Sequence, residues 1–378
     1  MFENNAALQN LGSWATAARR PSTMVRDGAD RHGLNAARWR ARTKRATMKA
    51  RLRDSIASLV AGSGAMTRRE ASLRGHLTIL CYHRVLPEPQ RSAYHDPDLV
   101  VTPDVLRTHC RLLTQHYTVL PLEKALRQIE GGGTGRPLAA ITFDDGYQDN
   151  CLLAAPILQE YGIQATFFVV AGLVDTDIVP WYDRAGLAWN ALAQRDLMLD
   201  ASNAREAMSK AKQLSPSQRE DWVAELQRQA GAVAIPAVDR IMTSPQLREL
   251  VSKGHEIGSH TMTHPLLPQC DDRTLTNELQ QSRAALAAIT GQAITGICYP
   301  NGDCDDRVAR ATTAAGYGYA TSVREGVNDP HALERFTLKR WFISQQRLCD
   351  RRGLPSDGLF RMEISGLAQR LFNRGSRP

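Results

Sequence analysis

The sequence predicts an α/β protein in which parallel strands and helices alternate to form a (β/α) barrel. Seven short apolar runs, each bounded by polar or turn-forming residues, are separated by segments with helical periodicity. This alternation is typical of βαβ units, which build a parallel sheet covered by helices. The predicted strands span residues 77–83, 139–146, 165–171, 255–260, 297–300, 319–322 and 338–344.

Helix start signals lie between these strands, at Thr102, at Ser244 and at either Asp271 or Asp272. The first two of these residues are followed by proline, which is favoured at the first helical position. Side chains of Ser, Thr and Asp accept hydrogen bonds from the free N–H groups of a helix start. The third helix is long and ends at Gly291, a residue type that is common just after the last turn.

The chain divides into a barrel at 77–345 and four segments around or within it. Residues 1–47 have the composition of a disordered basic arm. The sequence predicts an amphipathic helix and linker at residues 48–76 and a loose tail at 346–378. Residues 175–243 interrupt the strand and helix rhythm with polar, mostly helical sequence. We expect this segment to be a helical insertion that shapes the substrate groove.

The helix predicted after residue 47 is basic and amphipathic. Met48, Leu52, Ile56 and Leu59 recur at helical spacing, with Lys and Arg residues on the other faces. Two interpretations stay open. The helix packs on its own domain, or residues 48–60 rest on the anionic inner face of a membrane.

The positive charge of the chain is concentrated near its start. Residues 1–78 hold 15 of the 47 Lys and Arg residues and 5 of the 39 acidic residues, which leaves 32 against 34 for the rest. The barrel is therefore slightly acidic, which argues against nucleic acid as a partner. The sequence has no run of 18 apolar residues, no apolar core of a signal peptide and no C-x-x-C pair among its seven cysteines. We expect a cytoplasmic location, with possible contact to the inner membrane face.

One predicted strand ends in two adjacent carboxylates, Asp144 and Asp145, in the run T-F-D-D-G. The carboxyl ends of the strands converge on one face of a parallel barrel, where catalytic residues gather. Adjacent acids repel each other, so a strand end that carries both usually holds a cation. One carboxylate can then bind the ion while the other accepts a proton. An ordinary Asp-Gly turn is the alternative explanation.

Two histidines follow another predicted strand, His260 and His264 in the run S-H-T-M-T-H. Their separation of four places both imidazoles on one side of a helical turn, a spacing that suits a single metal ion. Such a pair alone more often makes structural hydrogen bonds. Together with an aspartate it forms a two-histidine, one-carboxylate site for one divalent ion, zinc first, with cobalt, nickel or iron as alternatives.

A third strand ends in a sharp turn, in the run C-Y-P-N-G-D that begins at Cys298. A turn of this kind can direct a backbone N–H group toward a developing oxyanion. A plain connection between a strand and a helix explains the run equally well.

The three runs, in this order, resemble the first three motifs of the polysaccharide deacetylase family, which is carbohydrate esterase family 4. The resemblance covers roughly residues 77–345 and implies a distorted barrel with fewer than eight strands. It implies that Asp144 is the general base and that the metal ligands are Asp145, His260 and His264. It also implies that the backbone N–H of Tyr299 helps to hold the oxyanion.

The sequence departs from the family pattern in the last motif. No L-x-H run follows Tyr319, where the family usually carries its general-acid histidine. His331 lies in that region, in the loop-like run N-D-P-H. The first strand instead ends at His83, which resembles the branch that acts on exopolysaccharides and takes its acid from the opening strand. We expect His83 to be the acid and keep His331 as the alternative.

Four further residues are candidates for the substrate pocket. Arg340 and Trp341 can replace the base-orienting arginine and the pocket tryptophan of the family, since the usual arginine of the third motif is missing. Pro300 and Asn301 belong to the turn after the third motif strand.

The resemblance implies a metal-dependent hydrolase that removes an N-acetyl group from an amino sugar. The substrate would be a glycan with N-acetylated sugars, either a polysaccharide, an oligosaccharide or a lipid-linked glycan. A deformylase or another carbon–nitrogen hydrolase of the same fold is the first alternative. A non-catalytic glycan-binding protein is the second, and the intact acid and histidine pairs argue against it.

Overall fold

The computed structural model describes residues 52–132, 135–195 and 203–372. The predicted arm at 1–47 and the first four residues of the predicted amphipathic helix lie outside these ranges. Within them, no helix combines the length and the apolar character that a membrane span requires. All seven cysteines fall in the described ranges and none forms a disulfide.

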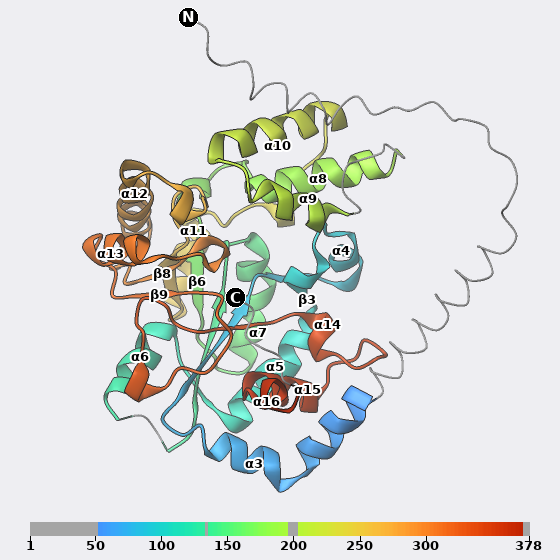
Figure 1. Ribbon diagram of the computed structural model, residues 1–378, viewed down its shortest axis with the longest axis vertical. Coiled ribbons are helices and arrows are strands. Elements are labelled where there is room, and N and C mark those ends of the chain that lie inside the picture. Colours follow the sequence, from blue (N-terminus) through green and yellow to red (C-terminus); the bar gives the residue numbers. More distant parts are fainter. Residues whose placement is uncertain (1–51, 133–134, 196–202, 373–378) are drawn as a thin grey trace, which may run out of the picture.

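The centre of the molecule is a curved sheet whose main path has seven parallel strands (Figure 1). Their order is β10-β1-β5-β6-β7-β8-β9, and β4 pairs with β5 beside this path. The predicted distorted barrel is confirmed, and each of the seven predicted strands is present with mostly shorter bounds. The strands are β1 (Leu77–Tyr82), β4 (Thr118–Val119), β5 (Leu138–Phe143), β6 (Thr166–Val169), β7 (Glu256–Ser259), β8 (Gly296–Cys298), β9 (Tyr319–Thr321) and β10 (Trp341–Phe342).

The last strand segment joins the two ends of the sheet. The N–H of Leu338 donates to the carbonyl oxygen of Ala320 in β9, at 3.0 Å. Three residues further on, β10 pairs with β1, where Trp341 lies opposite Leu80. One short stretch of chain therefore bridges β9 and β1. It carries Arg340 into the interior of the barrel.

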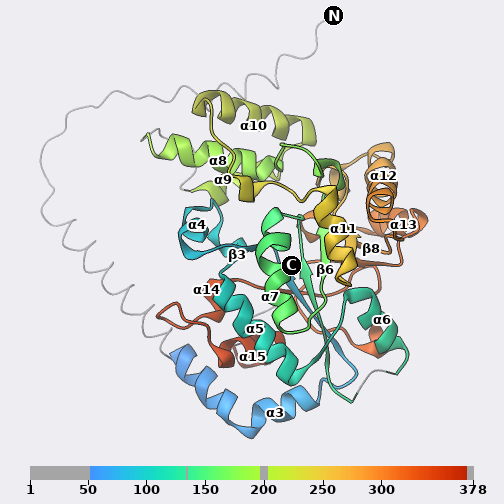
Figure 2. The same ribbon diagram turned by 180° about the vertical axis from the view of Figure 1, so that it is seen from behind.

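Helices cover the outside of the sheet (Figures 1 and 2). Thr102 is the N-cap of α5, as predicted, while the helix predicted at Ser244 has its cap one residue earlier. Asp271 caps α12, which ends at Gly291 in the left-handed conformation. The covering helices are α5 (Pro103–His116), α6 (Leu122–Glu130), α7 (Ala155–Glu160), α11 (Ser244–Ser252), α12 (Asp272–Thr290) and α13 (Asp306–Ala314). Short helical segments in the connections are η3 (Asn150–Ala154), η4 (Ala171–Leu173), η6 (Leu267–Gln269), η7 (Pro300–Gly302) and η8 (Pro330–Ala332).

The segment 175–243 contains three helices that gather at one end of the molecule, in the upper part of Figure 1. They are α8 (Trp181–Ala193), α9 (Ala204–Ala211) and α10 (Pro216–Ala230), followed by η5 (Ala237–Asp239). Their apolar faces form a core of their own, separate from the barrel core. Burial of this second core explains why the segment departs from the alternation of the barrel.

A buried arginine ties this insertion to the start of the barrel. Arg84 belongs to β2 (Arg84–Val85), which pairs with β3 (Val100–Val101). Its guanidinium lies 2.8 Å from Asp149 and also pairs with Asp239 of η5. The connection between β2 and β3 contains α4 (Glu88–Ala93) and η2 (Pro97–Leu99).

The two ends of the described chain pack against each other. Residues 52–62 are helical and lead into α3 (Gly64–Ala71). Met66 of α3 shares an apolar cluster with Met362. The expected loose tail is therefore wrong for the described residues up to 372, which form α14 (Gln345–Leu348), α15 (Asp357–Ile364) and α16 (Leu367–Phe372). Their apolar side chains are buried in the barrel core and in the cluster with the N-terminal helices.

Candidate active site

The two adjacent aspartates separate because the chain turns sharply after β5. Asp144 continues the sheet, since its N–H donates to the carbonyl oxygen of Tyr82 at 2.9 Å. Asp145 has a φ of 74° and Gly146 a φ of 80°. A Cβ atom at Gly146 would lie 2.9 Å from a methyl carbon of Val169, so glycine is required there. The turn directs the two carboxylates toward different partners.

Asp145 meets the two predicted histidines. Its Oδ1 atom lies 3.3 Å from Nε2 of His260 and 3.5 Å from Nε2 of His264. One ligand atom from each of the three side chains lies within 4.8 Å of the other two, and all three residues are buried. The structure thus brings the three predicted metal ligands together, at the carboxyl ends of β5 and β7.

The donor set fits a divalent metal ion. Nδ1 of His260 lies 2.8 Å from the carbonyl oxygen of Cys298. Because a carbonyl oxygen only accepts, Nδ1 carries the hydrogen and Nε2 faces Asp145. Burial lowers the pKa of His264 to about 3, so this imidazole is neutral. Burial would raise the pKa of Asp145, but its histidine neighbours hold it at about 2. A carboxylate and two imidazole nitrogens are ligands that zinc and related ions accept.

Strained backbone conformations occur in the turns after β5, β7 and β8. Five non-glycine residues of the described chain have a positive φ. Four of them lie in the turns after β5, β7 and β8, namely Asp145, Thr261, His264 and Asn301. Such conformations cost on the order of 1 kcal/mol or more each and persist where the surroundings hold them. Strain at sites of ligand or substrate contact is a common property of binding and catalytic loops.

A buried glutamate holds the turn between the two histidines. Glu278 of α12 accepts hydrogen bonds from the N–H of Met262 at 2.7 Å and from the N–H of Thr263 at 3.0 Å. The hydroxyl of Thr263 donates to the same carboxylate at 2.6 Å. The hydrogen bonds to Glu278 therefore fix the conformation of the turn that separates His260 from His264.

Asp144 forms a buried pair with Arg340. Two guanidinium nitrogens of Arg340 lie 2.7 and 2.8 Å from the two carboxylate oxygens of Asp144. Burial would raise the pKa of Asp144, but Arg340 outweighs this effect and holds the pKa well below its usual range. Arg340 therefore holds the carboxylate of Asp144 in place, and its role as the base-orienting arginine stays a prediction.

We expect the substitution Arg340→Met to destabilise the protein strongly, because it leaves the Asp144 carboxylate buried without its partner. Loss of one member of a buried ion pair costs about 3–5 kcal/mol. Urea denaturation of the two proteins would measure this difference in the free energy of unfolding.

The matched control is Arg335→Met. Arg335 pairs with Glu130, and both side chains are about 40% exposed. Loss of an exposed pair costs less than about 1 kcal/mol. Equal effects of the two substitutions would contradict a special role of the buried pair.

The structure separates the two candidates for the general acid. Nε2 of His83 lies 4.0 Å from Asp144, at the carboxyl end of β1. His331 is exposed in η8. Three residues before it, Asn328 pairs with Leu77, the first residue of β1. His331 thus lies near the amino end of the barrel, across the molecule from the aspartate pair.

The backbone N–H of Tyr299, which the resemblance assigns to the oxyanion, contacts a neighbouring strand in the structure, and its role in the reaction stays a prediction. Its N–H donates to the carbonyl oxygen of Thr321 in the neighbouring strand at 3.3 Å, so this group is used in the sheet. The side chain is fully buried. The pairing with the neighbouring strand extends one residue beyond β8, to Tyr299, which belongs to the predicted strand at 297–300, and this pairing takes up the N–H.

Trp341, the candidate for the pocket tryptophan, does not line a pocket. It is 1% exposed and belongs to the main core. Side chains alternate along a strand, so Trp341 points to the opposite face from Arg340. Its ring lies instead near Gly366, the residue in the chain between α15 and α16.

The turn after β8 meets the insertion. Pro300 is buried and Asn301 is exposed. The ammonium group of Lys212, from the end of α9, donates to Oδ1 of Asn301 at 2.5 Å. Asn301 thus lies where the insertion crosses the mouth of the site.

Four residues at the site were not identified from the sequence. The thiols of Cys81 and Cys298 each lie 3.4 Å from the same oxygen of Asp144. From α8, the ring of Tyr182 lies edge-on to His264, with centroids 5.0 Å apart. Lys212 acts electrostatically on His264 and Asp145. The helical period of α8 and α9 contains no signal for such contacts, because tertiary packing decides which side chain faces the barrel.

Comparison with known proteins agrees with this site. The family model described as polysaccharide deacetylase matches residues 131–320, half of the chain. The chain is 21% identical over 211 residues to YxkH of Bacillus subtilis, which carries the name of the same family; the match covers 56% of this chain and 53% of that protein. It is 40% identical over 78 residues to a chitooligosaccharide deacetylase of Sinorhizobium fredii, with 20% and 35% covered. The chain thus spans about half or less of the length of these curated relatives.

Solved structures agree in fold. IcaB from Ammonifex degensii matches with a TM-score of 0.51 and 17% identity, over 78% of this chain and 97% of that one. A polysaccharide deacetylase from Bacillus cereus matches with a TM-score of 0.50 and 21% identity, over 76% and 69%. The match of the family model over half of the sequence, with the aspartate and histidine motifs joined in one site, leads to a plain conclusion: the chain belongs to the polysaccharide deacetylase family.

Proposed function

We propose that the protein is a metal-dependent hydrolase that removes the N-acetyl group from an amino sugar of a glycan. One observation carries the proposal: Asp145, His260 and His264 converge on one point beside a second, separately held carboxylate. The family and the name of the chitooligosaccharide deacetylase relative support the type of substrate. We propose zinc as the ion.

The residues around the metal site would have different roles in the reaction. When bound, a divalent ion polarises an acyl carbonyl and lowers the pKa of a water, to about 7 in favourable zinc sites. Asp145, His260 and His264 would hold this ion. Asp144 is ionised and held by Arg340, so it can accept the proton of the attacking water. His83, whose Nε2 lies 4.0 Å from Asp144, can give a proton to the departing sugar nitrogen.

The test is metal content together with product release by the full chain. We expect one equivalent of a divalent ion and acetate release from N-acetylglucosamine oligomers or from lipid-linked sugars. Release of formate instead of acetate would indicate a deformylase. A protein that binds these glycans but releases neither acid would be a non-catalytic binder, and the proposed activity would be wrong.

We expect the substitution His83→Gln to retain the metal and to lower turnover by about 10²- to 10⁴-fold, the usual contribution of a general acid. Metal analysis and acetate release from the same preparation would measure both effects.

His331→Gln is the matched control, since it makes the same chemical change at the amino end of the barrel. It should leave turnover unchanged. Full activity of the His83 variant, or a loss confined to the His331 variant, would refute the assignment of the acid.

A further inference from the structure

We propose that the protein docks on an anionic phospholipid bilayer through a surface made by residues 52–62 and the loop after α14. We call this surface the docking face and define it by Leu52, Leu59, Leu354, Arg351 and Arg352. The inference does not depend on the proposed activity, because none of these residues contacts the metal site.

Large apolar side chains are exposed on the docking face. Leu52 is 61% exposed, Leu59 is 75% exposed and Leu354 is 56% exposed. Leu52 and Leu59 are two turns apart on one side of their helix. The adjoining side of this helix packs inward, through Ile56, Ala57 and Val60. The predicted apolar stripe is thus divided: Ile56 packs on the domain, while the two leucines face outward.

Contacts between the helix and the loop hold the two parts of the docking face together. The guanidinium of Arg53 donates to the carbonyl oxygen of Cys349 at 2.8 Å. The N–H of Arg351 donates to the carboxylate of Asp54 at 3.1 Å. The loop that carries the arginines therefore lies directly beside the helix that carries the leucines.

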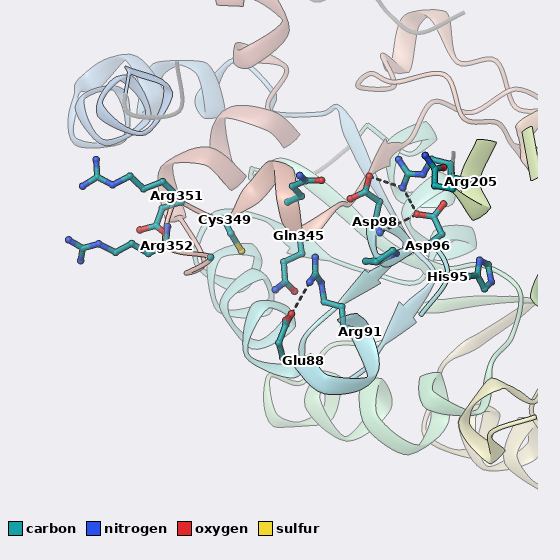
Figure 3. A pocket seen from close by; sticks show the side chains of 15 residues that line it. Glu88, Arg91, His95, Asp96, Asp98, Arg205, Gln345, Cys349, Arg351 and Arg352 are labelled. Carbon is teal, nitrogen blue, oxygen red and sulfur yellow. Dashed lines mark hydrogen bonds and ion pairs between the residues drawn. The ribbon is translucent and has the colours of Figure 1, made fainter. Parts of the chain in front are cut away.

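The docking face is bordered by unpaired positive charge. Arg351 and Arg352 are exposed, and within the described ranges neither guanidinium forms an ion pair. Both line the edge of a surface cavity of about 940 Å³, and Figure 3 shows their side chains reaching away from the other lining residues. Arg91 and Arg205 in the same cavity are paired with Glu88 and Asp96. Among the arginines that line this cavity, the ones without an ion pair in the described ranges are therefore Arg351 and Arg352, at its edge.

The segments that adjoin this surface in the chain are also basic. Residues 1–51, which lead into the helix, contain 11 Lys and Arg residues and 3 acidic residues. Residues 373–378, which follow α16, contain 2 Arg residues and no acidic residue. An exposed apolar strip flanked by such charge matches the chemistry of an anionic lipid surface, where apolar side chains enter the headgroup boundary and basic ones meet the phosphates.

The test is flotation of the full chain with lipid vesicles. We expect binding to vesicles of phosphatidylglycerol and phosphatidylcholine, weaker binding to phosphatidylcholine alone, and loss of binding at high salt. The double substitution Leu52→Glu with Leu59→Glu should weaken binding by at least about tenfold. Arg351→Gln with Arg352→Gln should weaken it about fivefold per arginine.

Leu152→Glu is the matched control. Leu152 is 53% exposed on η3 and is not one of the residues that define the docking face, so its substitution should leave flotation unchanged. Equal thermal unfolding of all variants would show that they are folded. The proposal is overturned if the full chain does not float with anionic vesicles, if the Leu52 and Leu59 variant binds like the Leu152 variant, or if RNA displaces the protein from vesicles at equal phosphate concentration.

Discussion

Replacing Asp145 by alanine should remove the bound metal and hydrolysis together. Asp145 supplies the one carboxylate of the site, and the nearest imidazole nitrogens face its Oδ1 atom at 3.3 and 3.5 Å. Loss of an outer partner of a metal ligand already costs about 10- to 100-fold in affinity, so loss of a ligand should cost more. His264→Ala should have the same effect. Metal content after dialysis and acetate release measure the two losses in one preparation.

Asp175→Ala is a matched control for this result. Asp175 is the one other aspartate of the described chain with a positive φ, 60°, and it is exposed in the loop before the insertion helices. The substitution makes the same chemical change in the same backbone conformation, at a carboxylate that accepts hydrogen bonds from Ser244 and is not one of the predicted metal ligands. Retention of the metal by the Asp145 variant, or its loss from the Asp175 variant, would exclude the proposed ligand set.

Replacing Asp144 by asparagine should keep the metal and abolish turnover. The amide has nearly the same shape as the carboxylate but cannot accept the proton of the attacking water. The expected loss is about 10²- to 10⁴-fold in the turnover rate, with unchanged metal content. The same two measurements as for Asp145 separate the roles of the neighbouring carboxylates.

The Arg340 contact requires a stability control for this variant. Asparagine would leave the guanidinium buried without its charge partner, so part of the protein could be unfolded. Activity should therefore be expressed per folded molecule, measured by circular dichroism. A folded Asp144→Asn protein with the full rate would show that another group accepts the proton.

The strands and the metal ligands were predictable because their signals are local. The run T-F-D-D-G contains the last two residues of a buried strand and two carboxylates, and His260 and His264 are four positions apart in the sequence. Parallel strand order then brings the ends of β5 and β7 to one face of the barrel. Only the pairing of β5, β6 and β7 had to be correct for the three ligands to meet.

The residues that the sequence did not identify come to the site through distant contacts. In the sequence, Cys81 and Cys298 resemble ordinary small apolar residues of strands. Only the folded barrel places both thiols beside Asp144. Lys212 and Tyr182 arrive from the insertion, whose helices are held by a separate core. Tyr299 shows a different limit of the sequence, since its motif position does not reveal that strand pairing also engages its N–H.

Closure of the barrel by the segment around β10 has a consequence for truncated forms of the chain. A nonsense mutation after β9 would spare every recognisable motif, so a search by motif would still report an intact enzyme. The shortened product would lack Arg340 and would expose the backbone edge of β1. An uncovered strand edge of this kind recruits other chains into aggregates, so the allele would be expected to behave as a null.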